Sequence, residues 1–310
     1  MQRMKIASTS TSVKSKRMAI KMDDQQQFDE MSEATTFCGC EAPYEASRFV
    51  IFGAPFDGQA SFRSGARFAP SAMRRDSWGL ESYSPILDRD LEDIGVADAG
   101  DLELPSDSTE DSLLRVQTAC TAILEDGKIP VMIGGDHSMT LAGIRAAANR
   151  YEDLHVVHID AHTDLREEYL GDPFSHASVM RRAYELLGDG RIHSFGVRSG
   201  LREEFAFAHE HLYFYPFTLE QAGRALDQIG EAPVYITIDL DVLDPSVCPG
   251  TGTPEPEGVS FTQLRHALSV FSKLHVVATD IMELSPPCDL SGASTAVACK
   301  LLREWLLMIE

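Results

Sequence analysis

Histidine and aspartate cluster in short segments of this chain, and their spacing suits metal ions. Side chains two residues apart in extended backbone point to the same side, so the acids and histidine of Asp160–Asp164 are expected to face one point. The segment Asp239–Asp241 follows the same rule. These ligands outnumber what one divalent ion needs, and bridging carboxylates would let two ions use them all. The candidate ligands are His137, Asp160, His162, Asp164, Asp239 and Asp241.

The ligand types indicate which metal and which chemistry to expect. Oxygen-rich sites with imidazole and no thiolate suit Mn²⁺ better than a structural zinc site or copper. Carboxylates that converge without a cation would repel one another and raise one another's pKa, so bound metal explains the cluster best. Two metals about 3.5–4 Å apart bridge a water and lower its pKa, which gives hydroxide near neutral pH. The sequence therefore predicts a two-metal site that attacks a carbon or phosphorus centre.

Two further residues are candidates for this chemistry. His176 lies on a loop that should hang over the metals and could act as general acid and base, although an ordinary loop histidine has the same signature. Glu283 follows a strand that ends at Ile281 and could face a cationic group of the substrate. The alternative is an exposed surface glutamate. His155 and His158 alternate with ligand-side positions of their strand, so we expect them to pack or to support the ligands.

Strands and helices alternate from residue 47 onward. Apolar, β-branched runs predict strands at 48–53, 129–133, 154–159, 192–197, 234–238 and 274–281. Helical spacing and capping residues predict helices at 65–78, 111–125, 138–148, 261–271 and 291–308. This alternation predicts a three-layer α/β/α fold with a mostly parallel central sheet. Ligands at the carboxyl ends of neighbouring parallel strands then converge where an open α/β sheet places its active site.

Composition excludes several classes of function. The net charge of -21 argues against nucleic-acid binding, because phosphate contacts need clustered lysine and arginine. A two-metal nuclease or phosphatase is disfavoured for the same reason. The negative charge fits a cationic substrate or bound divalent metals, although acidic surfaces are common for solubility alone, which is the favoured explanation. No apolar run reaches the roughly 20 residues that span a membrane. The 6 cysteines lack the paired clusters of a zinc site, and free thiols favour a cytoplasmic location.

The first residues differ from the rest of the chain. Residues 1–22 hold basic residues, no acid and a serine/threonine cluster, a composition typical of a transit peptide. Organellar import is therefore the alternative location; a disordered tail or an upstream start codon explains the segment as well. We expect residues 1–46 to form a poorly ordered N-terminal extension and residues 47–310 to form a single catalytic domain.

From about Phe52 to the C-terminus, the order of the motifs resembles the ureohydrolase family, which includes arginases and agmatinases. The motifs are GGDHS at 134–138, DAHTD at 160–164, SH at 175–176, the run from Asp239 to Pro254, and DIME at 280–283. The stretch over 52–75 and the run Gly250–Pro254 are similar to the agmatinase branch. The resemblance implies an arginase–deacetylase-like fold and a homotrimer or homohexamer.

The resemblance also implies roles for individual residues. Two Mn²⁺ ions would bind each subunit, bridged by Asp160 and Asp239. One ion would be held by His137, Asp160, Asp164 and Asp239. The other would be held by Asp160, His162, Asp239 and Asp241. The catalytic residues would be His176 as proton shuttle, Glu283 as the guanidinium acceptor, and Asp164. Attack of the bridging hydroxide on a guanidino carbon would release urea and an amine.

The substrate expected from the resemblance is agmatine, which yields putrescine for polyamine biosynthesis. Arginases carry an asparagine two residues beyond DAHTD and an SGN-type run before the loop histidine, and this chain has neither. An unpaired substrate carboxylate is costly to bury, so arginine is disfavoured. Arg166 could bind a carboxylate, whereas Glu167, Glu168 or Asp172 could face an ammonium group. Solvated loop charges explain each of these residues as well.

Other readings stay open from the sequence. A guanidino-acid hydrolase of the guanidinobutyrase or guanidinopropionase type would use the same site, while arginase and formiminoglutamase are disfavoured. A catalytically silent, metal-binding regulator is a different class, and the complete ligand set argues against it. Arg198 is expected to have a structural or site-edge role that the sequence does not assign.

Overall fold

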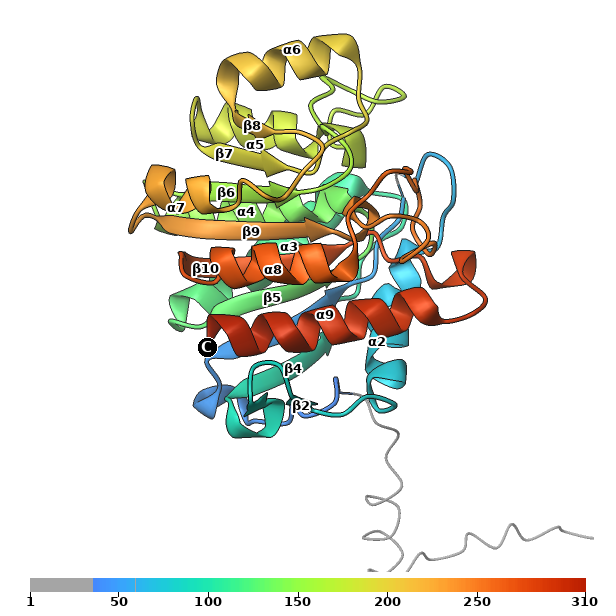
Figure 1. Cartoon of the computed structure of the whole chain (residues 1–310), viewed down its shortest axis with the longest axis vertical. Coiled ribbons are helices and arrows are strands. Elements are labelled where there is room, and N and C mark those ends of the chain that lie inside the picture. Colours follow the sequence, from blue (N-terminus) through green and yellow to red (C-terminus); the bar gives the residue numbers. More distant parts are fainter. Residues whose placement is uncertain (1–35, 59) are drawn as a thin grey trace, which may run out of the picture. The chain divides into compact units, whose positions relative to one another are not determined.

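The computed structural model describes residues 36–58 and 60–310. Eight strands form one sheet in the order β4-β1-β5-β10-β9-β6-β7-β8, and every neighbouring pair is parallel (Figure 1). The strands are β1 (Phe49–Ala54), β4 (Val96–Asp101), β5 (Ile129–Gly134), β6 (His155–Ile159), β7 (Ile192–Phe195), β8 (Tyr213–Tyr215), β9 (Pro233–Asp239) and β10 (His275–Met282). The predicted parallel sheet is confirmed.

Helices cover both faces of this sheet. One face carries α2 (Ala69–Ser77), α7 (Gly223–Ile229), α8 (Phe261–Phe271) and α9 (Ala293–Ile309). The other face carries α3 (Thr109–Glu125), α4 (Thr140–Arg150), α5 (Val179–Leu187) and α6 (Arg202–His211). The expected three layers are therefore confirmed. No helix in the described part of the chain is both long and apolar enough to cross a membrane.

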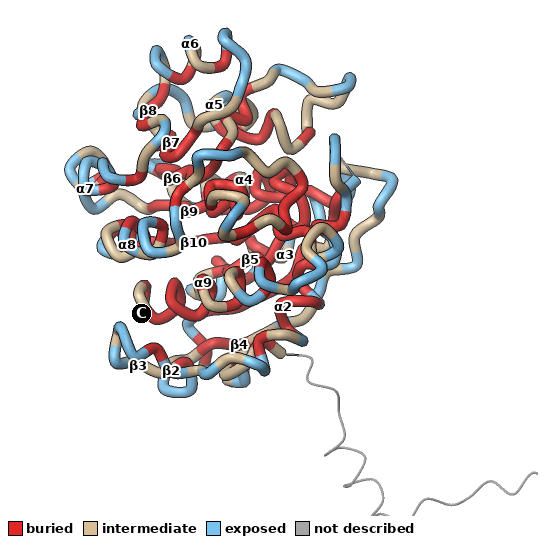
Figure 2. The backbone as a smooth tube through the Cα atoms, turned by 45° about the vertical axis from the view of Figure 1, so that its right-hand side comes forward, coloured by how far each residue is buried: buried red, intermediate tan, exposed pale blue. Residues whose placement is uncertain are grey.

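The strands are apolar throughout because both of their faces are buried. In β1, Phe49 and Ile51 pack under α2 and α9, whereas Val50 and Phe52 pack under α3 and α4. All six residues of β1 are buried, as Figure 2 shows for the centre of the sheet. A parallel sheet sandwiched between helices favours such continuous runs over strict alternation.

Several elements were not predicted. They are β4, β8, α5, α6, α7 and a two-stranded ribbon of β2 (Tyr83–Ser84) and β3 (Arg89–Asp90). Sheet edges explain two of them: β4 and β8 lie at the two ends of the strand order and are only partly buried. Short edge strands need less apolar sequence than central ones, so their periodic signal is weak.

The expected N-terminal extension lies mostly outside the described residues. Its described part, residues 36–46, packs against the domain: Phe37 and Cys40 are buried in the core, and a 3₁₀ turn spans Tyr44–Ala46. In residues 36–46 an apolar side chain and a thiol fill space beside the sheet, and the poor order expected of the extension as a whole stays a prediction. The boundary at residue 47 stays a prediction.

Four adjacent central strands carry the predicted site. In the strand order β5, β10, β9 and β6 lie side by side, so the loops that leave their carboxyl ends meet. β5 and β6 are consecutive strands in the chain, but in the sheet β10 and β9 lie between them. The crevice of an open parallel sheet lies at such a switch in strand order. This topology brings together segments that are more than a hundred residues apart in sequence, as with His137 and Glu283.

Candidate active site

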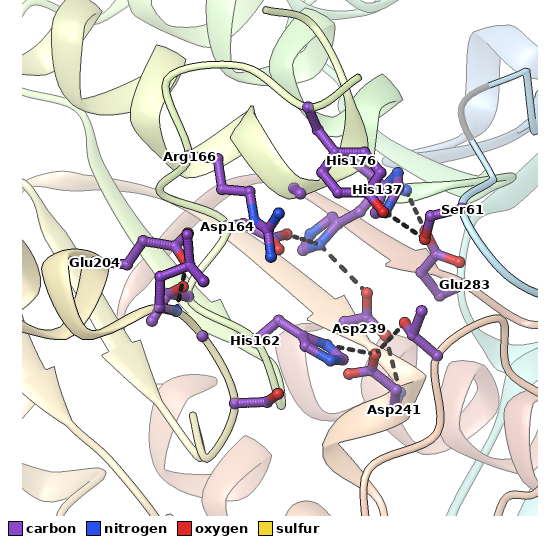
Figure 3. A pocket seen from close by; sticks show the side chains of 17 residues that line it. Ser61, His137, His162, Asp164, Arg166, His176, Glu204, Asp239, Asp241 and Glu283 are labelled. Carbon is purple, nitrogen blue, oxygen red and sulfur yellow. Dashed lines mark hydrogen bonds and ion pairs between the residues drawn. The ribbon is translucent and has the colours of Figure 1, made fainter. Parts of the chain in front are cut away.

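Each of the four central strands ends in predicted site residues. His137 follows β5, Asp160 follows β6 directly, Asp239 is the last residue of β9, and Glu283 follows β10. In Figure 3 the labelled residues of these loops face one cavity, with His137 and Asp239 near its centre. The structure thus brings the sequence-predicted ligands together at the carboxyl edge of the sheet.

A tight turn after β5 delivers His137. The backbone nitrogens of Gly135 and Asp136 donate to the carbonyls of Ala54 and Phe56, and a Cβ on Gly135 would lie 1.8 Å from the Phe56 carbonyl oxygen. Only glycine fits this close approach. The Asp136 carboxylate then accepts a hydrogen bond from the Ser138 backbone nitrogen at 3.1 Å and caps the 3₁₀ turn that begins at His137.

The first group of predicted ligands surrounds the Nδ1 atom of His137. Oxygens of Asp160 and Asp164 lie 3.0 Å from this nitrogen, and an Asp239 oxygen lies 3.3 Å away. Among the described residues this buried nitrogen has no partner with hydrogen-bond geometry, although three oxygens surround it. The other ring nitrogen, Nε2, contacts the Thr237 hydroxyl at 2.8 Å. Such an arrangement of carboxylate oxygens and one imidazole nitrogen fits a cation, with Thr237 orienting the ring.

The second group lies around His162. Its Nδ1 atom is 2.9 Å from Asp241 Oδ2 and 3.6 Å from Asp160 Oδ1 (Figure 3 shows His162 and Asp241). Asp160 therefore presents Oδ2 to the first group and Oδ1 to the second. Asp239 also connects the groups, because its Oδ1 accepts a hydrogen bond from the Asp241 backbone nitrogen at 2.8 Å. Two groups that share a carboxylate are arranged for a binuclear metal site.

The convergence is confirmed, but the reason given from sequence holds only in part. The segment after β6 is still strand-like at His162, which forms a parallel bridge with Ser199, and it leaves the extended region at Asp164, with φ 52. After β9 the chain turns at once into a 3₁₀ helix over Leu240–Val242. Turns therefore aim Asp164 and Asp241, whereas His162 lies in a strand-like bridge. Glu283 also has a positive φ, 65, and strained backbone at such positions costs about 1–3 kcal/mol each, offset by the surrounding fold.

The charges of this cluster are poorly balanced in the chain alone. Burial, followed by the charges of Asp241 and Asp160, holds the pKa of Asp239 well above its usual value. Burial and the Asp160 charge raise the pKa of Asp164 to about 6. Burial also opposes ionisation of Asp160, but His158 and hydrogen bonds from other imidazoles outweigh it and hold its pKa well below normal. A bound divalent cation would allow all these carboxylates to ionise.

We expect metal affinity to fall steeply in acid. Metal binding requires ionised carboxylates, so below about pH 6 a cation must displace the proton of Asp164, and each further pH unit should cost about tenfold in apparent affinity per displaced proton. The raised pKa of Asp239 extends the loss to higher pH. Calorimetric titration of the chelated protein with Mn²⁺ at several pH values, in buffers of different ionisation enthalpy, measures affinity and released protons. An affinity that does not change with pH would contradict this expectation.

His176 and Glu283 both line the same cavity, which encloses about 260 Å³. His176 begins a 3₁₀ turn, its Nε2 lies 3.2 Å from the Ser61 hydroxyl oxygen, and Tyr169 packs edge-on against its ring. Glu283 is 8% exposed, and its Oε1 accepts a hydrogen bond from the His137 backbone nitrogen at 2.7 Å. Burial and the Asp136 charge raise the pKa of Glu283 well above its usual value. The second oxygen can therefore take a cationic group that compensates the buried charge.

Four charged residues were candidates for binding the far end of a substrate, and only one of them lines the cavity. Arg166 lines the cavity, with its guanidinium 4.9 Å from the Tyr169 ring centroid. Glu167 and Glu168 are exposed, and Asp172 caps a turn by accepting from the Phe174 backbone nitrogen. None of these three acids is among the residues that line the cavity.

Sequence reasoning missed several residues of the site. Glu204 lines the cavity and is only 4% exposed, and it accepts hydrogen bonds from the backbone nitrogens of Leu165 and Leu201. The only available signal was its position in the first turn of α6, a helix that was not predicted. Thr253 contacts Asp241 Oδ2 at 3.3 Å. We expected His155 and His158 to pack or to support the ligands. His158 Nε2 contacts Asp160 at 2.8 Å, and the ring also lies within reach of the first group of ligands. His155 packs against His193 at the opposite end of the strand.

Comparison with known proteins agrees with this geometry. The chain is 41% identical over 284 residues to an agmatinase of Bacillus anthracis, an alignment that covers 90% of this chain and 98% of that protein. It is 33% identical over 270 residues to a human mitochondrial guanidino acid hydrolase, covering 83% of this chain and 77% of that protein. The crystal structure of agmatine ureohydrolase of Thermoplasma volcanium superposes with a TM-score of 0.85 at 35% identity, covering 92% of this chain and 97% of that one.

The match also extends to a family as a whole. The model of the arginase family matches residues 47–308, which include every predicted ligand, His176 and Glu283. The sheet order, the site at the carboxyl ends of its central strands and this match lead to one conclusion. The chain belongs to the arginase family.

Proposed function

We propose that this chain is a ureohydrolase that cleaves agmatine to urea and putrescine with two Mn²⁺ ions. One observation carries the proposal. Two groups of candidate ligands share Asp160, and they lie at one cavity that the buried Glu283 also lines. The relatives named above as agmatinase and agmatine ureohydrolase support the choice of substrate. We assign His137, Asp160, Asp164 and Asp239 to one ion. We assign Asp160, His162, Asp239 and Asp241 to the other.

The protein's own groups would bind and orient the substrate. When bound, the ions would supply a Lewis acid and lower the pKa of a coordinated water. Glu283 pairs with the guanidinium, and this cation compensates the buried carboxylate. Asp164, which lines the cavity, accepts a proton from the attacking water. As water adds to the guanidino carbon, the bond to the alkylamine nitrogen breaks, and His176 delivers a proton to that nitrogen. Urea and the amine leave.

The far end of agmatine is an ammonium group and needs a negative partner. Of the acidic residues expected from sequence, Glu167, Glu168 and Asp172 do not line the cavity. Glu204 does, and after accepting two backbone hydrogen bonds its carboxylate still has acceptor sites. We therefore assign Glu204 to the ammonium end of the substrate.

A guanidino acid is the second candidate substrate because Arg166 also lines the cavity. Its guanidinium could pair with a substrate carboxylate, and the human relative is named a guanidino acid hydrolase. Arginine combines an ammonium and a carboxylate at one carbon, and the arginase segments that hold them are missing here.

Urea release tests the proposal. The Mn²⁺-loaded protein would be assayed with agmatine, arginine, 4-guanidinobutyrate and 3-guanidinopropionate, with a chelated sample as control. Metal-dependent urea from agmatine alone is the expected result. Urea from a guanidino acid alone would support the same reaction with a guanidino acid as the substrate. Arg166→Met would then be the next variant to test. No urea from any of the four, with two ions bound, would reject the function.

His176→Ala should separate chemistry from metal binding. The side chain lines the cavity but belongs to neither group of candidate ligands, so both ions should stay bound. Loss of a general acid lowers turnover by about 10²–10⁴-fold. Steady-state kinetics and metal analysis on the same preparation check both statements. His209→Ala, on the exposed side of α6, is a control that should match the wild type. Loss of metal from His176→Ala would show that its assigned role is wrong.

Assembly and location complete the proposal. We expect a homotrimer or homohexamer, which sedimentation of the Mn²⁺-loaded protein would measure. A cytoplasmic setting is supported by the thiols, since all six cysteines are free. Reducing conditions preserve such thiols.

A further inference from the structure

Arg198 makes an unusual set of contacts beside the site. It follows β7, and each of its five guanidinium N–H groups has a backbone carbonyl to bind. Nε donates to Pro256 at 3.0 Å, and one terminal nitrogen donates to Gly196 at 3.4 Å and Val242 at 3.2 Å. The other terminal nitrogen donates to Asp241 and Glu255, both at 2.7 Å. No carboxylate takes part in these contacts.

Four of these carbonyls belong to the Asp241 turn, which carries a candidate ligand, or to the loop that supports it. Asp241 is a candidate ligand, and Val242 follows it. Glu255 and Pro256 follow Thr253, whose hydroxyl contacts Asp241 Oδ2 at 3.3 Å. A single side chain thus ties the Asp241 turn to the loop that supports it.

The backbone of Arg198 reaches the other half of the same group. The nitrogens of Arg198 and Ser199 donate to the carbonyl of Ala161 at 2.8 and 2.9 Å. Ala161 lies between Asp160 and His162, and its own nitrogen donates to Asp241 Oδ1 at 3.1 Å. The position of Arg198 is therefore set by one ligand segment while its side chain holds another.

We propose that Arg198 is a positioning residue for the metal ion assigned to Asp160, His162, Asp239 and Asp241. The inference rests on the proposed two-metal function and deepens it. None of the hydrogen bonds of Arg198 reaches His137 or Asp164, so the ion that these two residues hold should depend less on Arg198 than the other ion does.

Arginine suits this role for physical reasons. Its planar fork fixes the directions of all five donors, whereas lysine offers three donors from a single point. The cation also faces the negative ends of several carbonyl dipoles, which stabilises its charge without a carboxylate that would compete for the metal. Lysine should therefore keep the charge but lose the geometry, and methionine should lose both.

Metal titration of the chelated protein tests the proposal. Calorimetric titration with Mn²⁺ gives the stoichiometry and the affinity of each step, and electron paramagnetic resonance distinguishes a coupled pair of ions from a single one. In Arg198→Lys the weaker step should lose about 10–100-fold in affinity, the range typical of outer-shell partners of a metal. Arg198→Met should bind one ion and show the signal of a single Mn²⁺. The tighter step should weaken less than the weaker step in both variants.

Arg63→Lys is the matched control. Arg63 also holds two backbone carbonyls, of Pro249 and Cys288, but neither belongs to a ligand segment. It should bind two ions like the wild type. Two ions bound with wild-type affinity in folded Arg198→Lys and Arg198→Met would overturn the proposal, as would equal weakening of both steps. Where Arg198→Met fails to fold by far-UV circular dichroism, Arg198→Lys decides. A wild type that binds a single ion would instead overturn the two-metal function itself.

Discussion

Asp239→Asn should abolish the second metal ion, weaken the first and lower kcat/KM by at least about a thousandfold. Asp239 is 2% exposed, lies 3.3 Å from His137 Nδ1 and is linked to Asp241 through its backbone nitrogen. An amide of the same shape keeps the packing but removes the charge that a bridging ligand supplies. Metal ions contribute several kcal/mol to such reactions, and each 1.36 kcal/mol is about tenfold in rate. Metal analysis and urea release measure the two losses.

The same substitution should have the opposite effect on the metal-free chain. Burial and the charges of Asp241 and Asp160 hold the pKa of Asp239 well above normal, so ionised Asp239 destabilises the folded state when no cation is present. Removing the charge should therefore raise the melting temperature of the chelated protein at neutral pH. Excess Mn²⁺ should stabilise the wild type more than the variant. A ligand stabilises the folded state by binding to it, and the variant binds Mn²⁺ more weakly. Asp227→Ala, at an exposed position of α7, is the control for both effects. A variant that keeps two ions and normal turnover would contradict the bridging role.

The candidate metal site was predictable because the types of its residues alone indicate metal binding. Four carboxylates and two imidazoles behind strand-like segments imply a cation whatever the strand order, since such charges do not converge unpaired. The geometry was less predictable. The strand order places β10 and β9 between β5 and β6, and no local pattern records that insertion. Turns aim Asp164, Asp241 and Glu283, and the alternation of a strand does not predict them.

The residues that the sequence did not reveal act through long-range contacts. Glu204 reaches the cavity from α6, and Thr237 supports His137 from the middle of β9. Arg198 binds carbonyls, which every residue type possesses, so its partners carry no sequence signal. The ion-binding groups are thus visible as residue types, while the groups that orient them depend on the tertiary fold.

Glu283→Gln should leave both metal ions bound and lower kcat/KM for a guanidinium substrate by about 30- to 4,000-fold. The carboxylate is 8% exposed, and one oxygen already accepts from the His137 backbone nitrogen, so we assign the other oxygen to the guanidinium of the substrate. Truncating one partner of a buried charge pair costs about 2–5 kcal/mol. The amide keeps the shape of the side chain and lacks the charge. Metal analysis beside steady-state kinetics separates this loss from that of Asp239→Asn.

The pH dependence distinguishes Glu283 from a merely structural residue. Burial and the Asp136 charge raise its pKa well above normal, so a proton stays on Glu283 to higher pH than on an ordinary glutamate, and a cationic substrate must displace it where it is present. In the wild type kcat/KM should therefore rise with pH until this pKa is passed. Glu283→Gln has no proton to lose at this position, so its profile should lack that rise, while Glu283→Asp should keep it at reduced kcat/KM. If the rise persists unchanged in Glu283→Gln, another group controls it, and the guanidinium must bind elsewhere in the cavity.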